Sequence, residues 1–179
     1  MRVVYIGRFQ PFHKGHLAVI KHLAKAGHDI LLGIGSVQES RTLRNPFTGG
    51  ERLNMIHLAC EPYFNRIKYV CGLRDTNDDE KWYHLVMERF TPWEFDAIYT
   101  NNEHDRKIFE KHGIKMLGGE LFERDKYEGT KIRELIAKGS REVKWKYMVP
   151  VKTVTYLEDI RAREIIKDAY RREVNESKE

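Results

Sequence analysis

The sequence contains little cysteine and proline and has no long apolar run. Only 2 of its 179 residues are cysteine and 5 are proline. Cys60 and Cys71 lack the spacing of metal ligands, so we expect both to be reduced thiols that pack as small hydrophobic side chains. A membrane-spanning helix needs about 20 consecutive apolar residues, and no run in this chain approaches that length. These absences argue against a disulfide-rich secreted domain and against a helical membrane protein.

Known targeting and phosphate-binding signals are missing as well. The chain begins with an apolar, β-type run, Val3–Ile6, where a signal peptide would have a basic region and a longer apolar one. We therefore expect a cytoplasmic protein. No G-x-G-x-x-G follows this run, and G-x-x-x-x-G-K-[ST] occurs nowhere. The two common glycine-rich phosphate motifs are thus excluded.

The formal net charge of +5 raises the question of a nucleic-acid partner. Residues 131–179 hold 13 Lys and Arg against 9 Asp and Glu, and so account for +4 of this charge. The two signs are interleaved, as in EDIRAREIIKDAYRREVNESKE, which is typical of a solvated helix face. We expect neither a nucleic-acid nor a membrane partner.

The spacing of apolar residues alternates between strand and helix periods, which predicts a Rossmann-like α/β fold. The predicted strands are Val3–Ile6, Ile30–Ile34, Ile67–Val70, Ala97–Tyr99 and Ile114–Leu117. The predicted helices between them are His16–Ala26, Glu51–Cys60, Lys81–Phe90 and Glu103–His112. This order favours a parallel sheet with helices on both faces.

A helical segment, about residues 129–170, is expected to follow the sheet. Its first helix begins near Thr130 and stops at Gly139, a common C-terminal residue. A short turn or helix closed by Pro150 comes next, and a single long helix is predicted over 151–170. With no repeat or linker in the chain, residues 1–179 are expected to form one domain.

The most unusual stretch, GRFQPFHKGHL, directly follows the first predicted strand. Ligands of open α/β sheets bind beyond the carboxyl ends of the strands. Gly7 allows a ligand to approach the backbone closely, Arg8 and Lys14 are cationic, and a helix starting near Gly15–His16 offers unpaired N–H groups. The stretch contains no carboxylate and no nucleophilic Ser or Cys. It predicts a phosphate site that works by charge stabilisation.

His13 and His16 allow two interpretations. The H-x-G-H spacing can direct both imidazoles toward one point, with Gly15 leaving room between them. Alternatively, one histidine caps the helix and the other packs. No third residue has a convincing zinc-ligand spacing, so no protein-bound metal is expected.

A second cluster, EGTKIRELI, lies at residues 128–136. Thr130 occupies a predicted N-cap position, with Lys131 and Arg133 in the first turn. Cations are unfavourable at the positive end of a helix dipole, so their presence suggests a bound anion. The alternative is a capped surface helix with solvated charges.

Together these clusters resemble the H-x-G-H nucleotidyltransferase superfamily. GRFQPFHKGH, GIGSVQES, LRNPFTGGER, a tryptophan in the third helix and YEGTKIR resemble, in this order, the archaeal-type nicotinamide mononucleotide (NMN) adenylyltransferases. The resemblance covers roughly residues 1–160. Glu128 departs from it, because the family has a small, serine-like residue there.

The resemblance implies transfer of AMP from ATP to NMN, giving NAD and pyrophosphate, with substrate-bound Mg²⁺ as cofactor and a homo-oligomer, often a hexamer. It implies that His13, His16 and Arg133 are catalytic. ATP and its phosphates would contact Gly7, Arg8, Phe9, Lys14, Gly15, Arg44, Asn101, Thr130 and Lys131. NMN would contact Ser36, Asp75 and Trp82.

Two rival interpretations stay open at this point. One is another adenylyl- or cytidylyltransferase of the same superfamily, acting on a different phosphate. The other is a non-catalytic module that binds a nucleotide or RNA. For Trp82, stacking of its indole on the cationic nicotinamide ring competes with simple packing in the core.

Overall fold

The computed structural model describes residues 1–118, 126–139 and 143–176, and its chain divides into two compact units. Unit 1 comprises Met1–Arg8, Val19–Val37 and Pro62–Phe122. Unit 2 comprises Phe9–Ala18, Gln38–Glu61 and Glu123–Glu179. Each unit is therefore built from separate stretches of sequence.

Unit 1 contains a five-stranded parallel sheet. Its strands are β1 (Arg2–Gly7), β2 (Asp29–Ile34), β3 (Ile67–Gly72), β4 (Ala97–Tyr99) and β5 (Met116–Leu117), in the order β3-β2-β1-β4-β5. β1 pairs with β2 over its whole length and with β4 from Val3 to Tyr5. Residues Val3 to Ile6 are all buried, as expected for a central strand covered on both faces. The strand order reverses at β1, so a topological switch point lies between β1 and β4.

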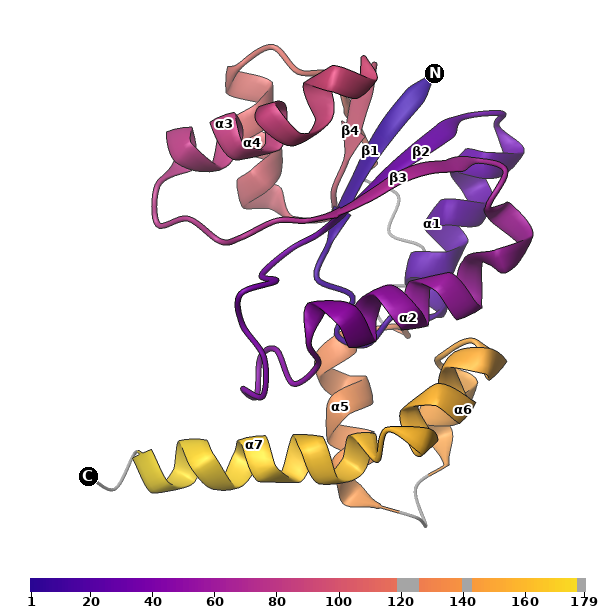
Figure 1. Ribbon diagram of the computed structural model, residues 1–179, viewed down its shortest axis with the longest axis vertical. Coiled ribbons are helices and arrows are strands. Elements are labelled where there is room, and N and C mark those ends of the chain that lie inside the picture. Colours follow the sequence, from indigo (N-terminus) through magenta and orange to yellow (C-terminus); the bar gives the residue numbers. More distant parts are fainter. Residues whose placement is uncertain (119–125, 140–142, 177–179) are drawn as a thin grey trace. The chain divides into compact units, whose positions relative to one another are not determined.

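Helices cover both faces of this sheet. Figure 1 shows α3 (Asp79–Phe90) and α4 (Glu103–Lys111) on one face and α1 (Lys14–Lys25) on the other. Only the part of α1 from Val19 onward belongs to unit 1. One core cluster consists of Val4, Ile6, Leu31, Leu73, Val86, Phe90, Ile98 and Phe109. The α/β prediction is confirmed, and β5 is shorter than predicted.

The described part of unit 2 consists of helices and the loops between them. It contains the start of α1, then α2 (Gly49–Cys60), α5 (Gly129–Lys138), the 3-10 helix η3 (Lys144–Tyr147), α6 (Val151–Asp159) and α7 (Ala162–Glu176). α2 packs against α6, while α5 packs against η3 and α7. Its core includes Phe12, Phe47, Met55, Ile132, Val149, Leu157 and Ile166.

The single long helix predicted over 151–170 is wrong. The chain leaves α6 after Asp159 and begins α7 at Ala162, with the backbone of Arg161 in the left-handed region at a φ of 55°. The N–H of Arg161 donates to the carbonyl of Glu158, and the carbonyl of Arg161 accepts from Glu164 and Ile165. Arg161 therefore ends one helix and caps the next, and α7 continues beyond residue 170.

Candidate phosphate-binding and catalytic site

His13 and His16 form a capping box at the start of α1. His13 is the N-cap, because its carbonyl accepts the first helical bond from the N–H of Leu17 at 3.1 Å. The backbone N–H of His16 donates to Nδ1 of His13 at 3.4 Å. In return, the backbone N–H of His13 donates to Nδ1 of His16 at 3.2 Å. This is the reciprocal arrangement usually made by Ser or Thr with Glu, and here two imidazoles make it.

The capping box fixes which nitrogen of each ring carries the proton. Both Nδ1 atoms accept hydrogen bonds, so in the neutral rings the proton sits on Nε2. The rings are stacked, with centroids 3.5 Å apart and an interplanar angle of 19°. Burial lowers the pKa of His13 to about 3. Burial, and then the proximity of His13, also holds the pKa of His16 well below its ordinary value.

Aromatic side chains pack around the two imidazoles. Phe9 meets the ring of His16 edge-on at 4.9 Å between centroids, and Phe12 lies 5.4 Å from it. Both phenylalanines are buried. Phe9 thus packs against the histidine pair, whereas the sequence resemblance named it only as a contact of ATP. Gly15 leaves room for the His13 ring, because a Cβ at that position would lie 3.1 Å from Nδ1 of His13 and 3.1 Å from Cβ of Tyr127 and would require a neighbour to shift.

The N–H groups at the start of α1 are less available than the sequence predicted. The helix begins at Lys14, one residue before the predicted start. The N–H of Lys14 donates to the carbonyl of Met148 at 2.9 Å, and that of His16 donates to the ring of His13. Among the described residues, none accepts a hydrogen bond from the N–H of Gly15. The donors of this site are therefore mainly the two Nε2–H groups, beside the N–H of Gly15.

The second predicted cluster lies in the same unit, at the start of α5. Thr130 is not the N-cap, contrary to the prediction. Glu128 takes that position with extended backbone, and its carbonyl accepts from the N–H of Ile132. Its carboxylate makes no capping bond, and the side chain is exposed. Thr130 and Lys131 are both exposed in the first turn, in keeping with a role toward a ligand.

Arg133 links α5 to the segment that carries the histidines. Its Nη1 donates to the backbone carbonyl of Gln10 at 2.8 Å, and its Nη2 donates to Oγ1 of Thr130 at 3.2 Å. Gly129 makes this approach possible, because a Cβ there would lie 3.0 Å from the carbonyl oxygen of Gln10. The structure thus brings His13, Thr130 and Arg133 into one unit, and the roles that the resemblance implies for them stay predictions.

The loop that carries Arg44 is held by hydrogen bonds at its base. Arg41 forms a two-pronged ion pair with Glu51, at 2.8 and 2.7 Å. Glu51 also completes the capping box of α2, in which it exchanges hydrogen bonds with Thr48. The pair with Arg41, despite partial burial, lowers the pKa of the Glu51 carboxyl. This network explains much of the sequence SRTLRNPFTGGER.

At the tip of this loop, Asn45 and Thr42 close a turn in which the N–H of Asn45 donates to Oγ1 of Thr42 at 2.9 Å. The N–H of Leu43 donates to the carboxylate of Glu173 in α7 at 2.9 Å. Arg44 itself is exposed. An exposed guanidinium on an anchored loop suits the predicted contact with phosphate.

Gln10 is a residue that the sequence reasoning missed. Its side-chain amide pairs with both backbone polar groups of Phe47, and its own carbonyl accepts from Arg133. A glutamine between a strand and a helix has many surface roles, so spacing alone gives no signal for such a link. The motif GRFQPF contains it, but without indicating what it contacts.

Unit 1 carries the remaining predicted residues beyond the carboxyl ends of its strands. Gly7 ends β1, the exposed Arg8 follows it, and the exposed Asn101 follows β4. These residues flank the topological switch point, where open α/β sheets bind ligands. Their contacts with ATP stay predictions.

Ser36 and Asp75 follow β2 and β3, respectively, and are brought together. Oγ of Ser36 donates to Oδ1 of Asp75 at 2.9 Å. Ser36 is buried and has a positive φ of 53°, whereas Asp75 is exposed. The pair therefore presents a carboxylate, oriented by a hydroxyl, at the same edge of the sheet.

Trp82 is half-buried in α3 and packs against the core cluster of unit 1. Its Nε1 is buried, with the Asp105 carboxyl nearby but outside hydrogen-bonding geometry. Burial raises the pKa of Asp105. The core-packing alternative thus has a structural basis, and stacking on nicotinamide stays a prediction.

In the described part of the chain, no three His, Cys, Asp or Glu side chains gather in a way that could hold a metal ion. No helix of residues 1–118, 126–139 or 143–176 combines the length and apolar character needed to cross a membrane. Cys60 and Cys71 are free thiols.

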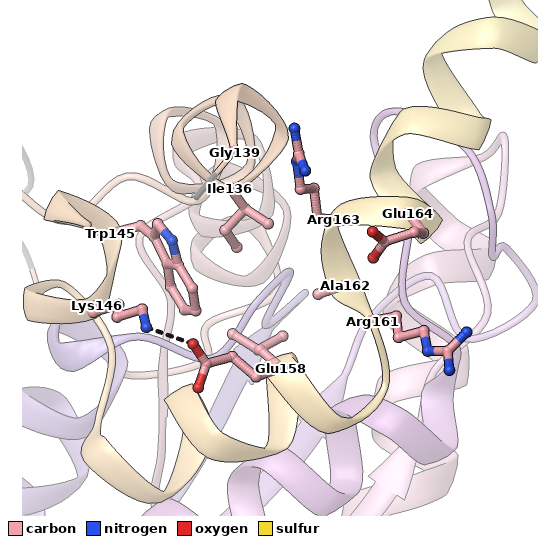
Figure 2. A pocket seen from close by; sticks show the side chains of 10 residues that line it. Ile136, Gly139, Trp145, Lys146, Glu158, Arg161, Ala162, Arg163 and Glu164 are labelled. Atoms are coloured by element: carbon pink, nitrogen blue, oxygen red, sulfur yellow. Dashed lines mark hydrogen bonds and ion pairs between the residues drawn. The ribbon is translucent and has the colours of Figure 1, made fainter. Parts of the chain in front are cut away.

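A cavity of about 260 Å³ lies elsewhere in unit 2, among α5, η3, α6 and α7. Figure 2 shows the Trp145 ring facing Ile136, with the Lys146–Glu158 ion pair along one side. None of the predicted site residues lines this cavity. The cavity is therefore distinct from the capping box and its phosphate donors.

Comparison with known proteins agrees with the geometry. The cytidylyltransferase-like family model matches residues 4–135. A nicotinamide-nucleotide adenylyltransferase of Methanococcus maripaludis is 41% identical over 160 residues, which cover 89% of this chain and 90% of that protein.

Solved structures share the fold at lower identity. A bifunctional NMN adenylyltransferase/ADP ribose pyrophosphatase from Francisella tularensis has a TM-score of 0.74 at 20% identity, and the match covers 94% of this chain but 52% of that chain. A second structure of that bifunctional protein, complexed with AMP and a manganese ion, has a TM-score of 0.71 at 21% identity, covering 94% and 51% of the two chains.

Proposed function

This chain belongs to the cytidylyltransferase-like family, and from that membership and its archaeal relatives we propose that it is a nicotinamide-nucleotide adenylyltransferase. It transfers the adenylyl group of ATP to NMN and releases pyrophosphate, forming NAD. The observation that carries the chemistry is the histidine capping box of α1, in one unit with Thr130 and Arg133.

The phosphate of NMN attacks the α-phosphorus of ATP, a new P–O bond forms, and the bond to the bridging oxygen of pyrophosphate breaks. The attacking phosphate is already ionised near neutral pH, since its second pKa is about 6. No general base is needed, which fits a site of hydrogen-bond donors. The rate acceleration comes from positioning and from stabilising negative charge in the transition state.

We assign His13 and His16 to the phosphates through their Nε2–H groups. A bound triphosphate raises the pKa of both rings, because a nearby anion favours the charged form. Arg133, Lys14, Lys131 and Arg44 add cationic donors, and Thr130 adds a hydroxyl. Preorganised donors of this kind are each worth about 10²–10³ in kcat.

The ends of the strands in unit 1 are assigned to recognition of the two nucleosides. Asn101, Gly7 and Arg8 would contact ATP, and the Ser36–Asp75 pair would accept hydrogen bonds from the ribose or carboxamide of NMN. A cationic nicotinamide ring would stack on Trp82.

Mg²⁺ is proposed as part of the ATP substrate, and the manganese ion reported with AMP in the Francisella protein supports a divalent cation in this role. We also propose that the enzyme acts in the cytoplasm and as a homo-oligomer. Light scattering after size-exclusion chromatography measures the oligomeric state directly, and a monomeric mass would contradict it.

Incubation of the purified chain with ATP, NMN and Mg²⁺ tests the function. We expect NAD and pyrophosphate in equal amounts, and neither without a divalent cation. Parallel reactions replace NMN with nicotinic acid mononucleotide, phosphopantetheine or flavin mononucleotide, and ATP with CTP. Pyrophosphate release with another pair, but not with ATP and either pyridine mononucleotide, would overturn the proposal.

A further inference from the structure

Gln10 has an unusual set of contacts for a loop residue. Its Nε2 donates to the carbonyl of Phe47 at 2.8 Å, and its Oε1 accepts from the N–H of Phe47 at 3.0 Å. The side chain of Gln10 is 4% exposed and Phe47 is fully buried. The amide therefore pairs with Phe47 as a neighbouring strand would, at the residue directly before the Thr48 N-cap of α2.

The backbone of Gln10 faces a different element. Its carbonyl accepts from Nη1 of Arg133 at 2.8 Å, and a Cβ at Gly129 would lie 3.0 Å from the same oxygen. Gln10 also lies three residues before the His13 N-cap. One residue thus contacts the Arg44 loop through its side chain and the Arg133 guanidinium through its main chain.

We infer that Gln10 is a positioning residue for the adenylyl transfer, acting through Arg133. By tying its side chain to Phe47, it fixes the place of its own carbonyl, and this carbonyl orients the guanidinium toward the phosphates. The inference rests on the proposed function in assigning Arg133 to phosphate.

The hydrogen bonds between Gln10 and Phe47 are important because they satisfy buried backbone groups. Loss of the Gln10 amide would leave the buried N–H and carbonyl of Phe47 without hydrogen-bond partners. Buried polar groups without partners are costly, so the Arg44 loop would move to satisfy them. Movement of the Arg44 loop would also displace the carbonyl of Gln10, which Arg133 contacts. A displacement of about 1 Å in a positioning group can cost about 10²-fold in rate.

The test is a double-mutant cycle with Gln10→Met, Arg133→Met and both together. Methionine matches the length of glutamine, is shorter than arginine, and removes the hydrogen bonds of both. The measured quantities are kcat, KM for ATP and for NMN, the Kd for inorganic tripolyphosphate, and the midpoint of thermal unfolding. Asn54→Leu is the matched control, because it removes a 3.1 Å bond to Tyr156 in the same unit.

We expect Gln10→Met to lower kcat by about 10²-fold and to weaken tripolyphosphate binding, with KM for NMN unchanged. In the Arg133→Met background, the same change should cost less than about threefold, since residues that act through each other are not additive. Asn54→Leu should leave kcat unchanged. Equal factors in both backgrounds, with only a lower unfolding midpoint, would overturn the inference.

Two provisions keep the outcomes distinct. Where Gln10→Met does not fold, Gln10→Glu replaces it, because a carboxylate still accepts from the N–H of Phe47 but cannot donate to its carbonyl. A wild type that makes no NAD, yet shows coupling in tripolyphosphate binding, refutes the proposed function and keeps only the part of the inference by which Gln10 positions Arg133 at a phosphate site. A wild type that makes NAD without such coupling refutes the inference alone.

Discussion

His13 and His16 each serve the helix and the ligand with different atoms of one ring. Nδ1 satisfies a backbone N–H at the helix start, and Nε2–H faces away as a donor. The two sequence interpretations, capping and catalysis, are therefore compatible. Capping explains the three-residue spacing, and it leaves the donor nitrogen in a fixed tautomer.

Substitutions at His13 can separate the two tasks. Asparagine caps helices well, so His13→Asn should keep the free energy of unfolding close to that of the wild type. It lacks the Nε2–H, and kcat should fall by about 10²–10³-fold. His13→Ala should lose a similar factor in kcat and about 1 kcal/mol of stability besides. Chemical unfolding and initial rates on both variants check this, and equal stability of the two would argue against the cap.

Gly15 and Gly50 form a matched pair for a second prediction. Each is the second residue of a helix that starts with a capping box, but a Cβ at Gly50 would meet nothing closer than Oγ1 of Thr48 at 4.0 Å. Gly15→Ala should displace the His13 ring and lower kcat about 10²-fold. Gly50→Ala should leave kcat near wild type and raise stability by up to about 1 kcal/mol. Similar rates for both variants would show that the ring position does not matter.

Trp82 needs an experiment that reads binding and stability separately. If it stacks on nicotinamide, Trp82→Ala should raise KM for NMN by roughly tenfold, which corresponds to a cation–π contact of about 1–2 kcal/mol. Trp82→Phe should raise it only modestly. If Trp82 only packs, alanine should cost about 3–5 kcal/mol of unfolding free energy with KM unchanged. Trp93, which stacks on Tyr69 at 4.7 Å, gives the control substitution.

At the scale of elements, the break between α6 and α7 depends on Arg161. Its left-handed backbone favours glycine, so Arg161→Gly should be more stable than Arg161→Ala by about 1 kcal/mol. Thr155, exposed within α6, should show the opposite order, with glycine about 1 kcal/mol below alanine. Urea unfolding of the four variants checks both orders. The same order at both positions would contradict a left-handed Arg161.

Sequence periodicity was sufficient for the strands but not for this break. β4 begins and ends where predicted, because Ala97–Tyr99 is a buried apolar run between polar residues. Arg161 carries neither of the usual signals, since no Gly or Pro marks the turn. Likewise, Thr130 is the better capping residue, yet Glu128 takes the N-cap because Gly129 must approach the carbonyl of Gln10. A tertiary contact accompanies the second case, whereas the hydrogen bonds around Arg161 are local.

The sequence motifs named candidate site residues, whose roles stay predictions, but gave no signal for contacts made by backbone groups. The placement of His13, Thr130 and Arg133 in one unit follows the resemblance. The capping box does not, because histidine is not among the residues preferred at N-caps. The side chain of Gln10 contacts backbone groups of Phe47, and such contacts do not require a particular residue type at position 47.

For the whole molecule, the two histidines predict how stability depends on pH. An unfolded histidine titrates near pH 6.5, while burial holds the pKa of His13 in the fold at about 3. Above pH 6.5 neither state binds the proton. As the pH falls from 6.5 toward 3, only the unfolded chain gains it, so the free energy of unfolding drops by up to about 1.4 kcal/mol per pH unit.

The measurement compares urea unfolding of the wild type and His13→Asn between pH 7 and pH 4.5. Carboxylates titrate in both proteins, so the difference between the two curves isolates His13. Stability of the wild type should fall more steeply, and saturating tripolyphosphate should reduce the difference. Parallel curves would mean that His13 binds a proton as readily in the folded protein as in the unfolded chain.

The two units alternate along the chain, with α1 beginning in one and ending in the other. This has a consequence for genetic dissection. A single cut anywhere in the coding sequence leaves at least one unit divided between two fragments, so neither truncation nor a simple gene fusion can isolate both. Recombination between relatives is constrained in the same way, because an exchange that replaces the histidine segment alone must still fit an Arg133 encoded more than one hundred codons downstream.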